Sequence, residues 1–259
     1  SRAGGTSSGT GTPPQSNYSS SVALPDDGTY RLGTLSARYE SGREGPVAIG
    51  WDSTGGHSYG QYQLAASVGA MGEYLAWCRT NAPDVYEALS RAGGESAARQ
   101  GTETFKNTWR TLMADAHAAE TQHSYIANKY YGGGLRSIQR RTGVDLSTRS
   151  PIVGDVIWST SVQHGAGGCA RIFDRAFQSL GTTNPSDAAI IEAVYNERGR
   201  DNGQAYFGRS TANVRASVVR RFQNEKADGL RYLAQWEETQ GRPTLASTDT
   251  VDGNTPTVG

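Results

Sequence analysis

The chain has 259 residues, enough for a domain that buries a full hydrophobic core without disulfide or metal support. Its 25 Lys and Arg residues balance 25 Asp and Glu residues, and this zero formal charge argues against nucleic acid as a partner. No apolar run reaches the roughly 20 residues of a membrane span, so the sequence also predicts no transmembrane segment.

The two ends of the chain differ in composition from the rest. Residues 1–28 consist mostly of Ser, Gly, Thr and Pro, and residues 241–259 have the same character. Such segments bury too little apolar surface to offset the entropy cost of ordering. We therefore expect a flexible linker or tail at 1–28, a folded domain at 29–240 and a flexible tail at 241–259. The first residues show neither an initiator Met nor the regions of a secretory signal, which indicates a fragment or a processed chain.

The front of the domain combines helices with a Gly-rich segment. Helices are predicted over about Thr34–Glu40 and Leu64–Cys78. Between them, glycines divide the stretch Ala48–Tyr62 into short pieces, which favours a small hairpin-like insertion. Apolar residues then recur at helical spacing over Phe105–Tyr130 and predict one long amphipathic helix behind a Thr102 cap.

The second half of the domain is predicted to be helical. The glycines Gly132-Gly133-Gly134 predict a flexible turn before it. Asn184 as a cap and Pro185 at the first helical position mark one helix start, and Gly229 marks a break if the last segment forms two helices. The predicted helices are Ile152–Gln163, Cys169–Leu180, Asn184–Val194 and Val214–Leu233. The fold class is therefore mainly α with a small Gly-rich hairpin.

Two carboxylates near the front stand in contrasting settings. Glu40 ends an apolar helix, where neighbouring apolar side chains can raise its pKa and keep it protonated. Asp52 lies in a polar, Gly-rich segment and is expected to stay ionised. A protonated and an ionised carboxyl group across a cleft are what cleavage of a glycosidic bond needs. Because the chain has 25 Asp and Glu residues, a pair at this spacing arises easily by chance, and the pair taken alone favours a solvated Glu and an Asp in a turn.

Three short motifs follow one another in the sequence: Glu40-Ser41, Gly60-Gln61-Tyr62-Gln63 and Ala193-Val194-Tyr195-Asn196. Their order resembles that of lysozyme-like peptidoglycan-cleaving domains of the lytic transglycosylase and goose-type branch, over about residues 35–200. The stretches 58–64 and 158–165 are also similar to a bacterial and phage group of cell-wall lysozyme domains. Those domains occur at the ends of larger proteins, including some type VI secretion effectors.

The resemblance implies a lysozyme-like helical domain that cuts peptidoglycan glycan strands between N-acetylmuramic acid and N-acetylglucosamine. Glu40 would be the catalytic acid, Gln63 and Asn196 would line the sugar cleft, and Tyr195 would lie near Glu40. The domain would be a monomeric part of a larger secreted or phage protein, delivered to the periplasm or cell wall without a signal peptide visible in this chain.

One departure from the transglycosylase pattern bears on the reaction. Asp52, followed by Thr54, resembles the Glu, Asp and Thr arrangement of phage-type lysozymes and the carboxylate pair of chitosanases. We therefore expect inverting hydrolysis with Glu40 as acid and Asp52 as base, and Thr54 helping to hold the water. Glu197 is a third candidate carboxylate, expected to pair with Arg198 or Arg200. The alternatives are a lytic transglycosylase that uses Glu40 alone, a chitosanase or chitinase-like hydrolase, and a non-catalytic wall-binding domain.

Several aromatic residues and one histidine are candidates for sugar contact. Trp51 and Tyr59 lie in polar, Gly-rich surroundings and are predicted to stack on sugar rings, whereas Trp109 and Trp158 are predicted to be core residues. His164 is predicted either to touch substrate or to be an ordinary hydrogen-bonded histidine.

No cofactor or metal ion is expected. His117 and His123 are six positions apart and lie on different faces of a helix, whereas a zinc helix needs a spacing of about four. Cys78 and Cys169 leave open a single bridge, but two buried free thiols are favoured because a large domain does not need a disulfide.

Overall fold

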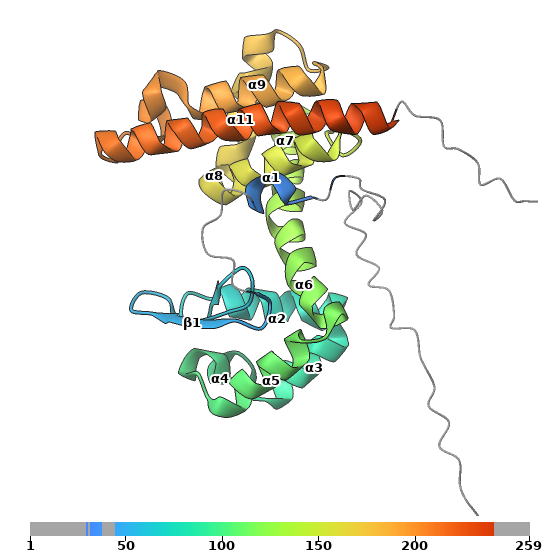
Figure 1. Cartoon of the computed structure of the whole chain (residues 1–259), viewed down its shortest axis with the longest axis vertical. Helices are drawn as coiled ribbons and strands as arrows, with labels where there is room; N and C mark the ends of the chain where they lie inside the picture. Colours follow the sequence, from blue (N-terminus) through green and yellow to red (C-terminus); the bar gives the residue numbers. More distant parts are fainter. Residues whose placement is uncertain (1–29, 31, 38–44, 241–259) are drawn as a thin grey trace, which may run out of the picture.

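The computed structural model of the protein describes residue 30, residues 32–37 and residues 45–240. Both predicted terminal segments and Glu40 lie outside the described residues. The described part is mainly helical with one small sheet, which confirms the predicted fold class at this level (Figure 1).

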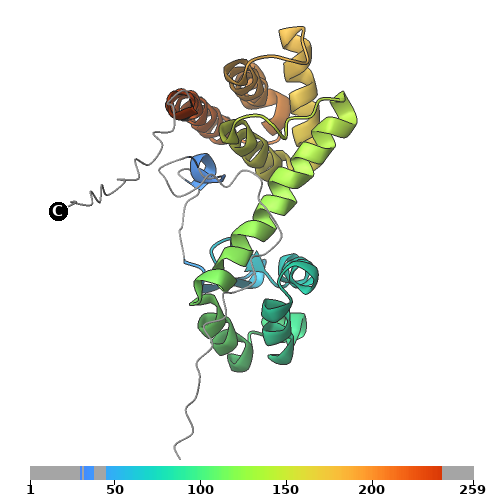
Figure 2. The same ribbon diagram turned by 90° about the vertical axis from the view of Figure 1, so that its right-hand side faces the viewer.

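The elements form two groups that a continuous helical rod connects (Figures 1 and 2). We call the first group the sheet lobe: β1 (Ile49–Asp52), β2 (Gly56–Tyr59), β3 (Leu64–Ala65), α2 (Ala70–Asn81), α3 (Pro83–Arg91), α4 (Gly94–Gln100) and α5 (Glu103–Met113). We call the second the helical lobe: α1 (Thr34–Ala37), α8 (Pro151–Leu180), α9 (Asp187–Arg198), the 3-10 helix η2 (Arg200–Gly203), α10 (Gln204–Phe207) and α11 (Ala212–Gln240). The rod consists of α6 (Ala116–Ile126), the π-helix η1 (Ala127–Gly132) and α7 (Gly133–Thr142).

The sheet is antiparallel, with the strand order β1-β2-β3. β1 pairs with β2 so that Asp52 lies opposite Gly56 at the hairpin turn, which confirms the predicted hairpin. The prediction of a helix from Leu64 is wrong at its start, because Leu64 and its neighbour pair with β2 as a third strand. The helix begins only at Ala70, after Gly69 has turned the chain with a φ of 89°.

Asp115 interrupts the helix that was predicted over Phe105–Tyr130. The predicted Thr102 cap is confirmed, since its hydroxyl accepts the N–H three residues later at 3.3 Å. At Asp115 the backbone is extended, and its carboxylate accepts the N–H groups of His117 at 3.0 Å and Ala118 at 3.1 Å. The carboxylate therefore caps a new helix, and the prediction of a single long helix is wrong.

Glycines allow the rod to pack closely on α8. The prediction of a flexible turn at Gly132–Gly134 is wrong, because these residues continue the helix. A Cβ added at Gly134 would lie 2.3 Å from Ser161 Oγ and 2.7 Å from Ile157 Cγ2. Only a residue without a side chain fits there, so Gly134 sets the distance between α7 and α8.

The helices of the second half are present, with corrected ends. Gly165, with φ 69° and ψ 167°, divides α8 into the two predicted helical segments. The next helix is capped by Ser186, whose hydroxyl accepts the N–H of Ala189 at 3.2 Å, so the predicted Asn184 cap is wrong. The Asn184 side chain instead accepts a hydrogen bond from Arg149 at 2.8 Å.

The last helix is unbroken. Gly229 does not interrupt α11, which runs as one helix through this position, so the predicted break is absent. A Cβ there would make ordinary contacts at 3.6 Å with side-chain atoms of Ile191 and Leu35.

The core lies mainly inside each lobe and along the rod. Trp109 and Trp158 are 0% and 2% exposed, which confirms both predicted core positions. Cys78 and Cys169 are buried free thiols, as favoured. Within the described ranges, each helix is too short or too polar to cross a lipid bilayer.

Candidate active site

Asp52 stands at the exposed end of β1, where the hairpin turns. Its Oδ1 accepts the backbone N–H groups of Thr54 at 2.8 Å and Gly55 at 2.6 Å. These two hydrogen bonds, with that of Gly55 the stronger influence, lower the pKa of Asp52 below its ordinary value of 3.8. Among the described residues, no donor bonds to Oδ2. The hairpin therefore presents an ionised carboxylate with one oxygen available to a solvent molecule.

Residues on both sides of Asp52 are on the surface. Trp51 is 67% exposed and Thr54 is exposed as well. An exposed indole next to a carboxylate is suited to stacking on a sugar ring, because an aromatic face packs well against sugar C–H groups.

The Gly-x-x-Gln motif closes the turn between β2 and β3. Gly60 has a φ of 80°, and a Cβ there would lie 2.1 Å from Gln122 Oε1, so the position requires glycine. The Gln122 side chain fixes this turn, because its Oε1 accepts the N–H of Gln61 at 2.9 Å and its Nε2 donates to the Pro46 carbonyl at 3.0 Å. The turn is thereby held against the rod helix α6.

Gln63 lies in the left-handed region, with a φ of 49°. Its Oε1 accepts from Ser58 Oγ at 2.7 Å, and its Nε2 donates to the Gly60 carbonyl at 2.9 Å. A Cβ at Gly50 would lie 3.0 Å from Gln63 Oε1, so the amide lies against β1, the strand that ends in Asp52. The structure thus places the second motif on the same sheet as the candidate base.

The remaining contact of this turn reaches the helical lobe. Tyr62 Oη lies 2.8 Å from His123 Nδ1, and the His123 ring lies 5.5 Å from the Trp158 ring. A Cβ at Gly33 would lie 3.5 Å from His123 Cε1 and 3.6 Å from the Trp158 ring. The start of α1 therefore lies beside the residues that contact the Gly-x-x-Gln turn.

Asp155 anchors α1 on the helical lobe. This carboxylate is 0% exposed. It accepts the backbone N–H of Leu35 at 3.0 Å, that of Gly33 and the hydroxyl of Tyr30. Burial, followed by the nearby Asp155 charge, raises the pKa of Tyr30 well above its ordinary range. Asp155 was not predicted from the sequence, although a carboxylate inside the apolar run 152–157 is a signal for such a role.

Glu40 belongs to the segment that joins α1 to β1. It lies outside the described residues, which resume at Gly45. The anchored α1 and the hairpin that carries Asp52 are the elements on either side of it.

The structure buries two residues that were predicted for the substrate site, Tyr59 to stack on a sugar ring and Tyr195 to lie near Glu40 and bind substrate. Tyr59 is 0% exposed, its hydroxyl donates to the Ala98 carbonyl at 2.8 Å, and its ring packs 5.4 Å from that of Trp109. Tyr195 is 3% exposed and donates to Glu225 Oε2 at 2.9 Å. Neither ring offers a face to a sugar, because each points into the core of its lobe.

Tyr195 belongs to a buried polar network that the sequence did not reveal. Arg198 and Glu225 are 0% and 2% exposed, and Arg198 Nη1 lies 3.6 Å from Glu225 Oε2. Ser159 Oγ donates to Glu225 at 2.9 Å and accepts from Arg198 at 3.1 Å. The network ties α8, α9 and α11 together at the third motif.

The prediction that Glu197 pairs with Arg198 or Arg200 is confirmed. Glu197 pairs with Arg200 at 3.2 Å, as one of the two expected partners, and lies 3.8 Å from Arg175. Arg198 instead points inward to the buried network. Glu197 is thus a carboxylate held by two guanidinium groups.

His164 and Asn196 lie near this network but in different settings. Burial lowers the pKa of His164 to about 3, and the nearby Arg198 and Arg221 contribute to this shift. Its ring packs 5.4 Å from the ring of Tyr206. Asn196 is exposed, and its Oδ1 accepts from Lys226 Nζ at 3.0 Å. Of the two residues, only Asn196 has a side chain on the surface.

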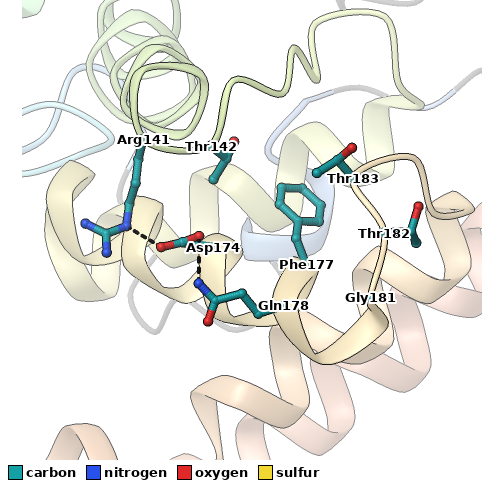
Figure 3. A pocket seen from close by; sticks show the side chains of 8 residues that line it. All are labelled: Arg141, Thr142, Asp174, Phe177, Gln178, Gly181, Thr182 and Thr183. Atoms are coloured by element: carbon teal, nitrogen blue, oxygen red, sulfur yellow. Dashed lines mark hydrogen bonds and ion pairs between the residues drawn. The ribbon is translucent and has the colours of Figure 1, made fainter.

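A separate cavity of about 500 Å³ lies between the ends of α7 and α8 (Figure 3). Phe177 lines it, and Arg141 Nε lies 2.8 Å from Asp174 Oδ2. Gln178 donates to the same carboxylate at 3.2 Å. Its charges are paired with each other, and none of the predicted site residues lines it.

The remaining histidines and the thiols do not form a metal centre. His117 contacts Asp84, and His123 contacts Tyr62. Burial raises the pKa of Cys78 to about 12 and that of Cys169 to about 12. In the part of the chain that the structure describes, no three His, Cys, Asp or Glu side chains gather as metal ligands would.

The fold and site define a mainly helical domain whose small sheet presents an ionised aspartate at an exposed hairpin turn. Residues 32–226 match the family described as type VI secretion system spike protein VgrG3-like, C-terminal, and the chain belongs to this family. It is 29% identical over 167 residues to the type VI secretion system spike protein VgrG3 of Vibrio cholerae serotype O1 (strain ATCC 39315 / El Tor Inaba N16961). The match covers 63% of this chain and 15% of that much longer protein. The expected relation to type VI secretion proteins is thereby confirmed.

Proposed function

We propose that this domain is a peptidoglycan hydrolase of the muramidase type. It hydrolyses the bond between N-acetylmuramic acid and N-acetylglucosamine, with Glu40 as general acid and Asp52 as general base. The observation that carries this proposal is the Asp52 carboxylate, which two backbone N–H groups keep ionised at an exposed turn.

Asp52 is suited to activate water. Its Oδ1 is occupied by two backbone amides, so the carboxylate is oriented, and Oδ2 is the oxygen that accepts the proton of the water. The water oxygen bonds to the anomeric carbon while that carbon releases the leaving oxygen, which takes the proton of Glu40. The product has an inverted anomeric centre, Asp52 releases the proton of the water to solvent, and the Glu40 carboxylate takes up a proton from solvent.

The anchoring of α1 supports Glu40 as the acid. Asp155 and Tyr30 fix the start of α1, and Glu40 follows the end of this helix by only three positions. Chain connectivity then limits the Glu40 carboxyl group to within a few residue lengths of the anchored helix.

The exposed polar residues near the carboxylates bind the sugar in this proposal. Gln63 lies beside β1, Thr54 follows Asp52, and Trp51 offers an exposed face. Asn196 contributes from the helical lobe. The buried Tyr59 and Tyr195 and the partly buried His164 support these residues from within instead of touching the substrate.

The family supports a place in a larger protein. The match covers only 15% of a relative that is named a type VI secretion system spike protein. We propose that this domain is likewise the end of a spike-type protein and reaches the periplasm of a target cell as its cargo. Within that assembly the domain acts as a monomer.

The proposal is tested with purified cell walls. Glu40→Gln and Asp52→Asn are compared with Asp145→Asn, a matched control whose exposed carboxylate also accepts a local backbone N–H, at 2.9 Å. We expect both site variants to lose clearing activity at least about 100-fold, as removal of a general acid or base does, and the control to retain it. Undiminished clearing by both site variants contradicts the assignment.

The products distinguish the alternatives. Mass spectrometry of soluble fragments with free reducing ends supports hydrolysis. Fragments that have lost one water indicate a lytic transglycosylase that uses Glu40 alone. Cleavage of chitosan or chitin in preference to peptidoglycan indicates a different polymer, and binding without any fragments indicates a non-catalytic wall-binding domain.

A further inference from the structure

Positive charge is concentrated in one part of the chain despite the neutral total. Residues 198–226 contain seven Lys and Arg residues and two Asp and Glu residues, whereas the whole chain has 25 of each kind. This segment covers the end of α9, η2, α10 and the first half of α11. The helical lobe thus carries a local field that the net charge conceals.

One face of α11 lines two adjoining cavities of about 190 and 370 Å³. The two share Asn202, Val219 and Gln223 as walls, so they form one groove. Lining residues recur along α11 from Ala212 to Lys226 at helical spacing, a length of roughly 21 Å. We call this the α11 groove.

The cations of the α11 groove have no carboxylate partner among the described residues. Arg215 and Arg220 line the larger cavity, and Lys226 lines the smaller one. Arg215 donates to the Ser210 carbonyl, and Lys226 donates to the Asn196 amide at 3.0 Å. Arg198, Arg200 and Arg221, which lie in the same segment, pair with carboxylates instead.

The groove adjoins the proposed sugar site. Asn196 lines its smaller cavity and is the residue of the third motif proposed to bind sugar. In Figure 1, the hairpin that ends β1 and the first half of α11 extend toward the same side of the molecule. A glycan strand that runs from the hairpin past Asn196 would bring its side branches to the groove.

We propose that the α11 groove binds the carboxylate-bearing peptide that branches from the muramic acid of the glycan strand. The choice of this anion rests on the proposed function. Asn202 and Gln223 supply amide groups that match peptide bonds, Val219 supplies an apolar wall, and the cations match the carboxylates. The length of roughly 21 Å accommodates an extended peptide of up to about six residues, so a branch of about four residues fits within it.

The experiment measures binding apart from cleavage. In an Asp52→Asn background, isothermal titration compares a purified disaccharide tetrapeptide with the same disaccharide without peptide. The groove variant is Arg215→Gln/Arg220→Gln. The control is Arg79→Gln/Arg136→Gln, which removes two exposed arginines that line neither cavity of the groove.

We expect the groove variant to bind the peptide-bearing ligand about tenfold more weakly and the peptide-free disaccharide unchanged. The control is expected to bind both as the parent does, and added salt to reduce the difference. If the double variant does not fold, the single Arg220→Gln replaces it, because that side chain is exposed. Equal weakening by the groove and control variants, or equal weakening for both ligands, overturns the proposal.

Failure of this inference differs from failure of the proposed function. If the parent protein cleaves cell walls and the groove variant binds the disaccharide tetrapeptide unchanged, the hydrolase assignment stands and the groove assignment fails. If the groove variant loses binding of the peptide-bearing ligand alone, and the parent protein does not cleave cell walls, the groove assignment stands and the hydrolase assignment fails.

Discussion

Arg198 and Glu225 form an ion pair in the interior of the helical lobe, with Nη1 3.6 Å from Oε2 and side chains 0% and 3% exposed. The guanidinium also lies over the Phe222 ring, 4.1 Å from its centroid. Burial lowers the pKa of Arg198, while Glu225 and Tyr195 counteract this effect. Ser159, Glu225 and the aromatic rings replace part of the hydration of the guanidinium, whereas its Nε has no hydrogen-bond partner among the described residues.

Removing one member of this pair is expected to destabilise the domain strongly. Arg198→Met leaves the buried Glu225 carboxylate with only Arg221 as a cation, whose Nε lies 3.4 Å from Oε1 on a partly exposed side chain. The free energy of unfolding should therefore fall by about 3 kcal/mol in urea titrations, the lower end of what breaking a buried pair costs. The control Arg91→Met breaks an exposed pair with Glu87, 2.8 Å apart, and should cost less than about 1 kcal/mol. Equal losses in the two variants would contradict the buried role.

Gly134 and its neighbour provide a test of helix packing. Gly134→Ala places a methyl group against Ser161 and Ile157, and should lower the free energy of unfolding by about 1–3 kcal/mol. Gly133→Ala meets nothing within 4 Å in the same helix and should be neutral or stabilising by about 0.4–1 kcal/mol. Thermal unfolding of the two variants checks this, and a stable Gly134→Ala protein would show that the helices can separate at low cost.

The lowered pKa of Asp52 predicts how the rate of wall cleavage changes on the acid side of the pH profile. Its pKa lies below 3.8, so the base stays ionised, and its contribution to kcat/KM is retained as the pH falls to about 4. Initial rates are measured between pH 3 and 7 with the folded fraction recorded at each pH. An acid limb centred at pH 5 or above in fully folded protein would exclude Asp52 as the only base.

The lowered pKa of His164 predicts that the free energy of unfolding declines in acid. The unfolded histidine has an ordinary pKa of 6.5, and the folded one titrates at about 3, so the unfolded state binds an extra proton between these values. The free energy of unfolding should therefore fall as the pH drops from 6.5 toward 3, by roughly 2–4 kcal/mol from this group.

The variant His164→Gln lacks this group and should show a shallower decline from pH 7 to pH 4. His117→Gln, which keeps the His164 imidazole, serves as the control and should retain the full decline. Urea titrations at several pH values give both slopes, and identical slopes for the two variants would rule out His164 as the cause.

Local signals predicted much of the fold. Thr102 marked a helix start because a cap is a property of a few consecutive residues, and the glycines of residues 48–62 marked the hairpin for the same reason. The break at Asp115 was missed because apolar periodicity continues across it, on two helices that each bury one face. The short helices α3 and α4 were not predicted, since each spans only two or three turns.

The site was less predictable because its supporting contacts join distant parts of the chain. Tyr59 was expected at the surface from its Gly-rich neighbours, but it lies on the inward face of β2 against α5. Asp155 contacts Leu35 across 120 positions, and Glu225 contacts Ser159 across 66. No pattern in a single sequence pairs such residues before the fold is known.

The anchoring of α1 by Asp155 has a consequence for the order of folding. The first described helix of the chain binds a residue that is synthesised about 120 positions later. During synthesis, all residues of the sheet lobe leave the ribosome before Asp155 does, and their shorter loops close at lower entropic cost. The sheet lobe can therefore fold while α1 still lacks its partner, so the helix made first is among the last to reach its final place.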